Sequence, residues 1–329
     1  MSNLDPSPEV LQARKSLIGD GNEVRRLLPQ RTVRTIGPWC FLDHYGPDDI
    51  SASAGMQVPP HPHIGLQTVS WLFDGLVLHR DSLGNQQLIR PGELNLMTSG
   101  RGITHSEESP ARARARPPLL HGVQLWVALP KAQQFMVPGF AHHAELPVAE
   151  VAGARVTVIA GEFAGRRSPA VVHSPLVGLE VNLPGGGNVT LATLEDFEYG
   201  VIAVDGPASV SALDRSVVAC DHPVSGVASG AVATAESATI GPGSLAHLPA
   251  GSTSIELSAA GPNRFLVVGG TPLGERLVLW WNFVGRTAEE IASARESWAA
   301  RDGRFGEVRG YPGSPLPAPP LPPGPLQPR

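Results

Sequence analysis

Two pairs of residues, each separated by one intervening residue, carry side chains that could bind a metal. The first pair is His61-Pro62-His63, and the second is His105-Ser106-Glu107. Residues two positions apart on an extended strand point to the same face, so two adjacent strands would direct three imidazoles and one carboxylate at one point. This donor set suits a first-row transition metal such as Fe(II), Mn, Co, Ni, Cu or Zn. We therefore predict a metal site formed by His61, His63, His105 and Glu107.

Such a metal site could take part in catalysis. Four protein ligands in an octahedral field leave two positions for a substrate or dioxygen. Glu107 is the only acid of the four, and it is also the candidate catalytic base, because it could accept a substrate hydroxyl proton. The alternative is a closed site that only joins two strands. Closed structural sites are usually tetrahedral and rich in sulfur, and the sequence has no cysteine near these four residues.

The segment between the two pairs predicts the strands that must position them. Residues 65–73, 76–80, 86–90 and 94–97 are rich in strand formers, and turn residues at 74–75, 81–85 and 91–92 separate them. Short strands with frequent turns are typical of an antiparallel sandwich or barrel. Prolines 59, 60 and 62 cannot donate to a sheet ladder, so the first histidine pair is expected at a sheet edge or at the start of a strand.

The second half predicts another barrel without a metal. Plausible strands cover residues 155–160, 176–183, 199–204 and 208–213, and residues 240–248 weakly repeat the segment that begins at Ile89. After residue 108 no His-x-His occurs. His143-Ala144-Glu145 has no second pair to complete a site, so we expect it to be a surface segment.

A helix is predicted near the end of the chain. It begins around Arg286, with Thr287 as the N-cap and Glu290 completing a capping box, and it ends before Asp302. From Tyr311 onward, proline dominates and predicts an extended, unpacked tail. The predicted domains are an N-terminal metal-binding barrel (1–140), a C-terminal barrel without metal ligands (141–285), a helix (286–306) and a Pro-rich disordered tail (307–329).

Composition narrows the function classes. The chain has 329 residues, enough for about two domains, and a net charge of −5 that offers no electrostatic footprint for nucleic acid. Its two cysteines, Cys40 and Cys220, fall in different halves, so a disulfide framework is not expected. No apolar run suggests a signal peptide or a membrane span, so we expect a cytoplasmic protein that binds no membrane.

Three motif runs, at residues 61–69, 79–85 and 89–107, together resemble the pirin family of bicupins. Gly37-Pro38-Trp39 with residues 41–47 is similar to the opening signature of that family, and residues 120–127 are similar to its next strand. The resemblance implies an all-β fold of two jelly-roll cupin barrels, with iron in the N-terminal one. Matched by position, the family's ligands are His61, His63, His105 and Glu107.

Other polar residues in these runs have weaker assignments. Either His121 or Gln124 is a candidate hydrogen-bond partner for a metal-bound imidazole. His44 and His79 are expected to be ordinary polar residues on strands.

Two functions follow from the residues and the resemblance. One is a metal-dependent dioxygenase of quercetin 2,3-dioxygenase type, with a flavonol or similar enol-bearing aromatic as its small-molecule substrate. The other is an iron-binding regulatory protein that acts through a protein partner without catalytic turnover. An open apolar cavity beside the metal would favour the enzyme.

Overall fold

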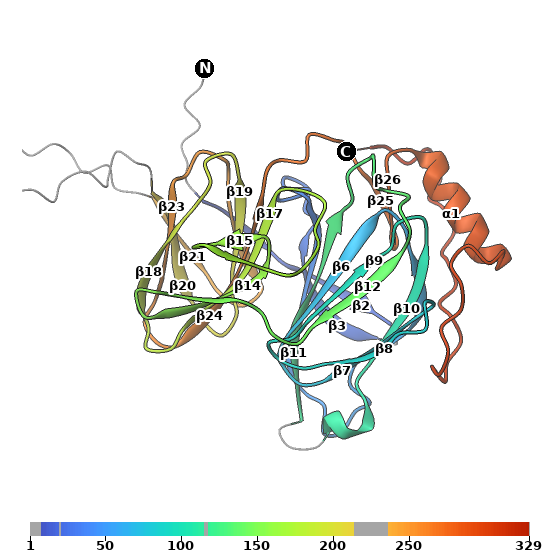
Figure 1. Cartoon of the computed structure of the whole chain (residues 1–329), viewed down its shortest axis with the longest axis horizontal. Helices are drawn as coiled ribbons and strands as arrows, with labels where there is room; N and C mark the ends of the chain where they lie inside the picture. The colour runs from blue at the N-terminus through green and yellow to red at the C-terminus, as the bar shows by residue number, and fades with distance from the viewer. Residues whose placement is uncertain (1–7, 20, 115–117, 214–235, 329) are drawn as a thin grey trace, which may run out of the picture. The chain divides into compact units, whose positions relative to one another are not determined.

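The computed structural model describes residues 8–19, 21–114, 118–213 and 236–328, which form two β-barrel units (Figure 1). The first unit comprises Arg14–Leu146, Pro169–Ser174 and Leu273–Arg329, and the second comprises Met1–Ala13, Pro147–Ser168 and Pro175–Pro272. The regular structure of the described residues is almost entirely β-strand, with one α-helix after the last strand. The predicted all-β fold of two barrels with a C-terminal helix is confirmed.

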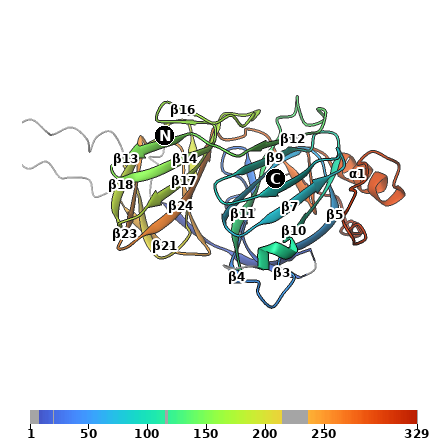
Figure 2. The ribbon, with the colours of Figure 1, turned by 60° about the horizontal axis from the view of Figure 1, so that its bottom comes forward.

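The first barrel consists of two antiparallel sheets. The larger has the order β12-β9-β6-β11-β4-β3-β2, and the smaller has the order β5-β10-β7-β8, in which β5, β10 and β7 lie side by side (Figure 2). The strands of the larger sheet are β2 (Arg14–Ile18), β3 (Asn22–Leu28), β4 (Trp39–Asp49), β6 (Leu66–Asp74), β9 (Leu94–Thr98), β11 (Leu119–Ala128) and β12 (Gly139–His143). Those of the smaller sheet are β5 (Gln57–His63), β7 (Val77–Asp81), β8 (Gln86–Ile89) and β10 (Ile103–Glu108), and a 3-10 helix follows at η1 (Ala111–Arg114).

The second barrel repeats this arrangement strand for strand. Its sheets have the orders β1-β22-β19-β24-β17-β14-β13 and β18-β23-β20-β21. The larger sheet contains β1 (Glu9–Gln12), β13 (Val148–Val151), β14 (Ala154–Ala160), β17 (Leu176–Leu183), β19 (Glu198–Ala203), β22 (Ser244–Leu248) and β24 (Asn263–Gly270). The smaller contains β18 (Gly187–Ala192), β20 (Ala208–Leu213), β21 (Ser237–Ile240) and β23 (Ser254–Ala259), and a hairpin joins β15 (Glu162–Phe163) to β16 (Arg166–Arg167).

The two units are not consecutive along the chain, which differs from the simple division at residue 140. β12 pairs with β9, so residues 141–146 belong to the first barrel. β1 pairs with β22 of the second barrel. The domain boundaries differ because strands at the end of each large sheet pair with strands far away in the sequence. A boundary inferred from an internal sequence repeat does not take such pairing into account.

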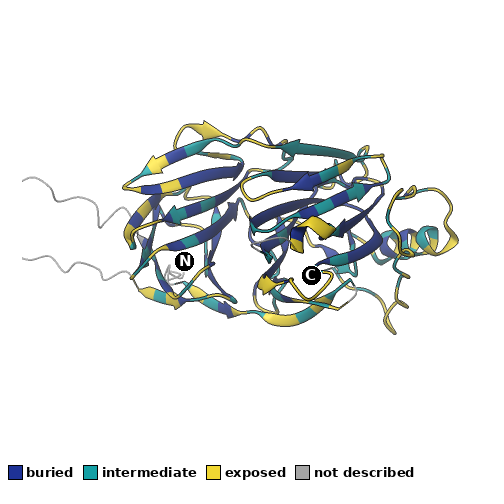
Figure 3. Cartoon of the chain, turned by 90° about the horizontal axis from the view of Figure 1, so that it is seen from below, coloured by how far each residue is buried: buried dark blue, intermediate teal, exposed yellow. Residues whose placement is uncertain are grey.

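The prolines and the strand patterns explain the local structure. β5 is an edge strand, as its three prolines predict. The buried positions of β18 alternate with exposed ones, as expected for a sheet with one face toward the core. Figure 3 shows the same contrast across the barrels, with buried strand positions and exposed turns.

The C-terminal segment returns to the first barrel. Strands β25 (Val278–Trp280) and β26 (Phe283–Gly285) form a hairpin, and α1 (Ala288–Ala300) follows, with the predicted Thr287–Glu290 capping box. Ile291 and Ala294 of α1 are buried in a cluster with Phe283 and Phe305. Among the described residues, no helix has the length and apolarity needed to cross a membrane.

The proline-rich tail has no regular secondary structure over residues 307–328, but it contacts the first barrel and the helix. Leu316 donates its backbone N–H to the carbonyl oxygen of Pro60 at 2.8 Å. Its own carbonyl oxygen accepts a hydrogen bond from Trp298 Nε1 at 2.9 Å, and the carbonyl of Pro319 accepts one from Arg295 at 2.7 Å. These contacts differ from the expected unpacked tail, because carbonyl groups of proline-rich chain remain free to accept hydrogen bonds.

Candidate metal centre

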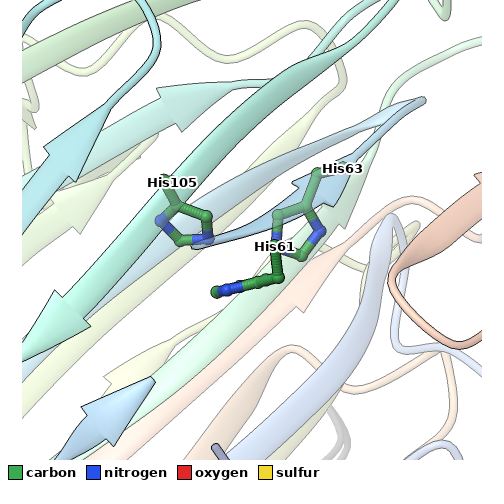
Figure 4. A group of neighbouring side chains, drawn as sticks. All are labelled: His61, His63 and His105. Carbon is green, nitrogen blue, oxygen red and sulfur yellow. The ribbon is translucent and has the colours of Figure 1, made fainter. Parts of the chain in front are cut away.

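Strands β5 and β10 bring the two predicted residue pairs together. Their antiparallel register places His61 opposite His105 and His63 opposite Ile103. One nitrogen from each of His61, His63 and His105 lies within 4.8 Å of the other two. Figure 4 shows the three imidazole rings grouped between these strands. The three histidines are therefore close enough to share one ion.

Backbone carbonyl groups fix the tautomers of the first two histidines. Nδ1 of His61 lies 2.9 Å from the carbonyl oxygen of Pro59, and Nδ1 of His63 lies 2.9 Å from that of Asn282. A carbonyl oxygen only accepts, so each Nδ1 carries the proton and donates it. Nε2 of both rings consequently keeps its lone pair, the form that a metal requires.

A chain of hydrogen bonds from β7 fixes the third histidine. Nε2 of His79 lies 3.3 Å from the carboxylate of Asp81, which can only accept when ionised, so His79 donates from Nε2. Nδ1 of His79 is then the acceptor for Nδ1–H of His105, 3.4 Å away. Nε2 of His105 is left with a lone pair. It is buried and has no hydrogen-bond partner among the described residues.

Burial keeps the three imidazoles neutral. Desolvation is the largest effect on each: it lowers the pKa of His61 to about 4 and places the pKa of His63 and His105 well below the usual value. Repulsion from the neighbouring histidines lowers the pKa of His63 and His105 further. Neutral imidazole is the ligand form, so the rings are available to a cation without losing a proton first.

Glu107 lies beside the third histidine of this group. The register between β5 and β10 shifts between His105 and Glu107, where the extra residue is on β5, and β10 continues its alternation with Glu107 opposite His79 of β7. One of its oxygens lies within 4.8 Å of nitrogens of both His79 and His105, in a second group that overlaps the three-histidine group at His105. Binding of one ion by all four predicted residues stays a prediction.

The Glu107 carboxyl group lies in a polar network on the inside of the barrel. The hydroxyl oxygen of Ser70 lies 3.2 Å from Oε1 of Glu107 and 2.8 Å from Oε1 of Gln124. Burial raises the pKa of Glu107, while His79, Ser70 and Gln124 oppose the shift. The raised pKa makes this carboxylate a better proton acceptor than that of an exposed glutamate.

These residues fit a divalent transition metal. The donor set offers three neutral nitrogens, each with a defined tautomer, and one adjacent carboxylate. The partnerless Nε2 of His105 is the strongest indication, because a buried polar atom without a partner is costly unless a ligand occupies it.

A cavity of about 310 Å³ opens beside the histidines. His61, His63 and Glu107 form part of its wall. The aromatic part of the wall consists of Phe41, Tyr45, Trp126 and Trp281. The rings of Phe41 and Trp126 stack with centroids 3.9 Å apart, and Trp126 meets the His63 ring edge-on at 5.1 Å.

One charged pair also lines this cavity. Arg26 donates two hydrogen bonds of 2.8 Å to the buried carboxylate of Asp43, and its guanidinium lies 4.5 Å from the centre of the Phe41 ring. Desolvation raises the pKa of Asp43, although Arg26 opposes the shift. No local sequence pattern marks this pair, because Arg26 and Asp43 are 17 residues apart and lie on different strands.

The predicted supporting residues are only partly correct. Gln124 does contact the site through Ser70. The Nε2 atoms of His121 and His44 lie 2.8 Å apart, and support of a metal-bound imidazole by His121 stays a prediction. The structure gives that role to His79, which was expected to be an ordinary strand residue. The sequence signal was His79-Arg80-Asp81, which has the same alternate spacing as the ligand pairs.

The comparisons with known proteins agree with this architecture. Residues 21–127 match the family model described as Pirin, and residues 178–306 match the one described as Pirin C-terminal cupin domain. The chain belongs to the pirin family. Both barrels are therefore cupin domains, and the resemblance inferred from the motifs is confirmed.

Individual pirin-family relatives cover most of the chain. A Pseudomonas aeruginosa protein named "Putative quercetin 2,3-dioxygenase" is 40% identical over 307 residues, which are 93% of this chain and 88% of that protein. A Caulobacter vibrioides "Pirin-like protein" is 34% identical over 88% of this chain and 92% of its own length. The crystal structure of a quercetin 2,3-dioxygenase from Acinetobacter baumannii superimposes with a TM-score of 0.84 at 39% identity, over 97% of each chain.

Proposed function

We propose that this pirin-family chain is a metal-dependent dioxygenase of quercetin 2,3-dioxygenase type, acting on a flavonol or a similar enol-bearing aromatic. The observation that carries the proposal is the three-histidine group that opens onto a cavity with an aromatic wall. The names of the Pseudomonas aeruginosa and Acinetobacter baumannii relatives support the same reaction.

His61, His63, His105 and Glu107 would hold the metal, for which we propose Fe(II). Manganese, cobalt, nickel, copper or zinc would fit the same donors. When bound, such an ion supplies Lewis acidity toward a substrate oxygen and contact with dioxygen. The protein prepares the donors: the Pro59 and Asn282 carbonyl groups and His79 hold the three imidazoles in the ligand tautomer.

The cavity wall would position a planar substrate. The Phe41–Trp126 stack extends from Arg26 to His63, so an aromatic ring packed on it would lie beside the histidines. The guanidinium of Arg26 is then suited to bind an electron-rich oxygen on the far part of that ring system.

Glu107 would accept the hydroxyl proton of the enol. Its raised pKa brings the carboxyl group closer to the operating pH than an exposed glutamate. Tyr45 lines the same cavity, and burial together with the Glu107 charge places its pKa well above the usual value. Tyr45 therefore stays a neutral phenol that can donate a hydrogen bond, and Glu107 is the group that takes the proton.

The open cavity favours the enzyme over a regulatory protein without turnover. A purely structural or signalling metal needs no space for a second molecule, whereas small-molecule sites are concave and largely apolar. The cavity beside His61 and His63 is concave and combines an aromatic wall with polar groups such as Arg26 and Glu107, and so offers space and contacts for a second molecule.

The test is oxygen uptake after anaerobic reconstitution with Fe(II), with quercetin as substrate. We expect uptake coupled to loss of quercetin absorbance, and a decrease of at least about 100-fold for His61→Ala. His247→Ala is the matched control, because His247 lies on β22 of the second barrel and pairs with Glu198. If quercetin and other enol-bearing aromatics give no metal-dependent uptake, the proposed reaction is wrong.

A further inference from the structure

The second barrel has strands that correspond to those of the candidate metal site, but these strands do not carry its metal-ligating side chains. By position in the sheets, β18 and β23 correspond to β5 and β10. The inward positions on β18 are Val189 and Leu191, and those on β23 are Ile255 and Leu257, each at most 1% exposed. The register pairs Leu191 with Ile255 and Val189 with Leu257. Aliphatic side chains therefore occupy the strand faces that carry histidines in the first barrel.

A cavity nevertheless persists in this barrel, and its volume is about 540 Å³. Residues of β13, β15, β17, β18, β19, β23 and β24 line it. Five of these strands, β13, β17, β18, β23 and β24, have counterparts in the first barrel, β2, β4, β5, β10 and β11, that line the cavity beside the histidines. A larger chamber with more apolar lining thus lies at the corresponding place in the second barrel.

The chamber has an apolar interior and a nearly neutral wall. Leu179, Leu191, Ile255 and Val267 line it, and each is almost completely buried. None of the described residues that line it is Lys, Arg or His. Its one carboxylate, Glu162, is half-exposed and forms an ion pair with Arg167 at 2.6 Å. A charged ligand would find no compensating group inside, so the chamber excludes ions.

Tyr199 brings a buried hydroxyl group to the lining of the chamber, and this group can recognise a ligand. The hydroxyl oxygen of Tyr199 accepts a hydrogen bond from the backbone N–H of Leu194 at 2.9 Å, so its own proton remains to be donated. Burial raises the pKa of Tyr199 to about 12, which keeps the hydroxyl protonated. A ligand with an acceptor oxygen would complete this hydrogen bond.

We propose that the second barrel binds a small, neutral, mainly apolar molecule that carries one hydrogen-bond acceptor, such as an aromatic ketone. The volume lies within the range of pockets that enclose ligands of that size. The apolar lining would provide most of the affinity, and Tyr199 would orient the acceptor. This binding site is independent of the metal and of the proposed dioxygenase reaction.

The test uses prodan, a neutral naphthyl ketone whose fluorescence shifts to the blue in apolar surroundings, titrated into the full-length protein. We expect one blue-shifted site whose affinity does not change with EDTA, because none of the described lining residues is His or Cys and the single carboxylate, Glu162, is paired with Arg167. Anilinonaphthalene sulfonate, an anionic aromatic of similar size, should bind at least about tenfold more weakly.

Two variants assign the site to the second barrel. Val151→Trp fills the chamber from a half-buried position on β13 and should abolish the blue-shifted signal. Tyr199→Phe keeps the ring but removes the donor, and should weaken binding by about fivefold to tenfold. Ile18→Trp is the matched control, because Ile18 occupies a half-buried position on the counterpart strand β2 and lines the first cavity.

Thermal unfolding of each variant verifies that it is folded. The proposal is overturned if prodan does not bind, if the signal survives in folded Val151→Trp, or if Ile18→Trp abolishes it. Equal prodan affinity of Tyr199→Phe and the parent protein would show that Tyr199 does not donate the proposed hydrogen bond. Tighter binding of anilinonaphthalene sulfonate than of prodan would contradict the preference for a neutral ligand.

Discussion

His63 donates its Nδ1 proton to the carbonyl oxygen of Asn282, a residue 219 positions later in the chain. The contact joins the predicted metal site to the turn between β25 and β26. The same turn contributes Trp281 and Asn282 to the wall of the first cavity. The C-terminal hairpin thus takes part both in orienting the His63 imidazole and in forming the wall of the first cavity.

The hydrogen-bond chain through His79 gives a prediction about metal affinity. His79→Phe should preserve the ring stacked on Phe140, whose centroid is 4.6 Å away, but it removes the acceptor for His105 Nδ1–H. We expect metal affinity to fall by about 10- to 100-fold, measured by competition with a chromophoric chelator. His247→Phe in the second barrel should leave it unchanged, and equal affinities for both variants would disprove the role of His79.

The buried histidines predict how the stability of the metal-free protein depends on pH. The folded pKa of His61 is about 4, whereas an unfolded histidine titrates near 6.5. Between these values the unfolded state binds more protons, so the free energy of unfolding should decrease as the pH falls from 6.5 toward 4. The slope is at most about 1.4 kcal/mol per pH unit for each such histidine. Urea titrations of the parent and His61→Gln should show a shallower slope in the variant.

Gly65 supplies a prediction about close packing. It has a φ of 71°, and a Cβ atom there would lie 2.1 Å from the carbonyl oxygen of Val284. Gly65→Ala should destabilise the protein by about 3–4 kcal/mol, through left-handed strain and overlap with β26. Gly84→Ala is the control, since Gly84 has a φ of 93° but no atom within 4 Å of the added Cβ. Gly84→Ala should lower the free energy of unfolding by only about 1–2 kcal/mol. Denaturant titrations of both variants measure the difference.

Substitutions in the Arg26–Asp43 pair should have separable effects on the stability of the protein and on substrate binding. Arg26→Met leaves the carboxylate of Asp43, which is 2% exposed, without its partner. The expected loss is about 2–4 kcal/mol of unfolding free energy. Arg26→Met with Asp43→Asn should regain most of that stability, but its KM for quercetin should stay raised. A normal KM in the double variant would show that Arg26 does not contact the substrate.

Cys40 gives a prediction about reactivity. It is fully buried on β4, and burial raises its thiol pKa to about 12. In a Cys220→Ser background, native protein should resist alkylation by iodoacetamide at pH 8, and unfolded protein should react at once. Rapid labelling under native conditions would contradict the burial. Cys220 itself lies outside the described residues.

The ligand pairs and the edge strand could be predicted from the sequence because each has a local signature. The alternate spacing places His61 and His63 on one face of β5 and His105 and Glu107 on one face of β10, and proline confines β5 to an edge. The capping box at Thr287 is equally local. For the histidine pairs, the edge strand and the capping box, a short stretch of sequence is enough to predict the local conformation.

The remaining features depend on partners that have no local signature. The Asn282 carbonyl that orients His63 is a backbone group, which any residue could supply. β1 belongs to the second barrel because it pairs with β22. Residues 9–12 contain no local pattern that predicts this pairing. The hydrogen bond from Ser70 to Glu107 joins residues 37 positions apart, and no short sequence pattern predicts it.

The discontinuous first barrel has a consequence for synthesis on the ribosome. The second barrel contains every residue that it needs once position 272 has emerged, whereas the first must wait for the hairpin at 278–285. The later part of the gene therefore encodes the unit that can mature first. The His63–Asn282 hydrogen bond can form only after translation has passed Asn282, so the proposed metal should bind late, after the second barrel has folded.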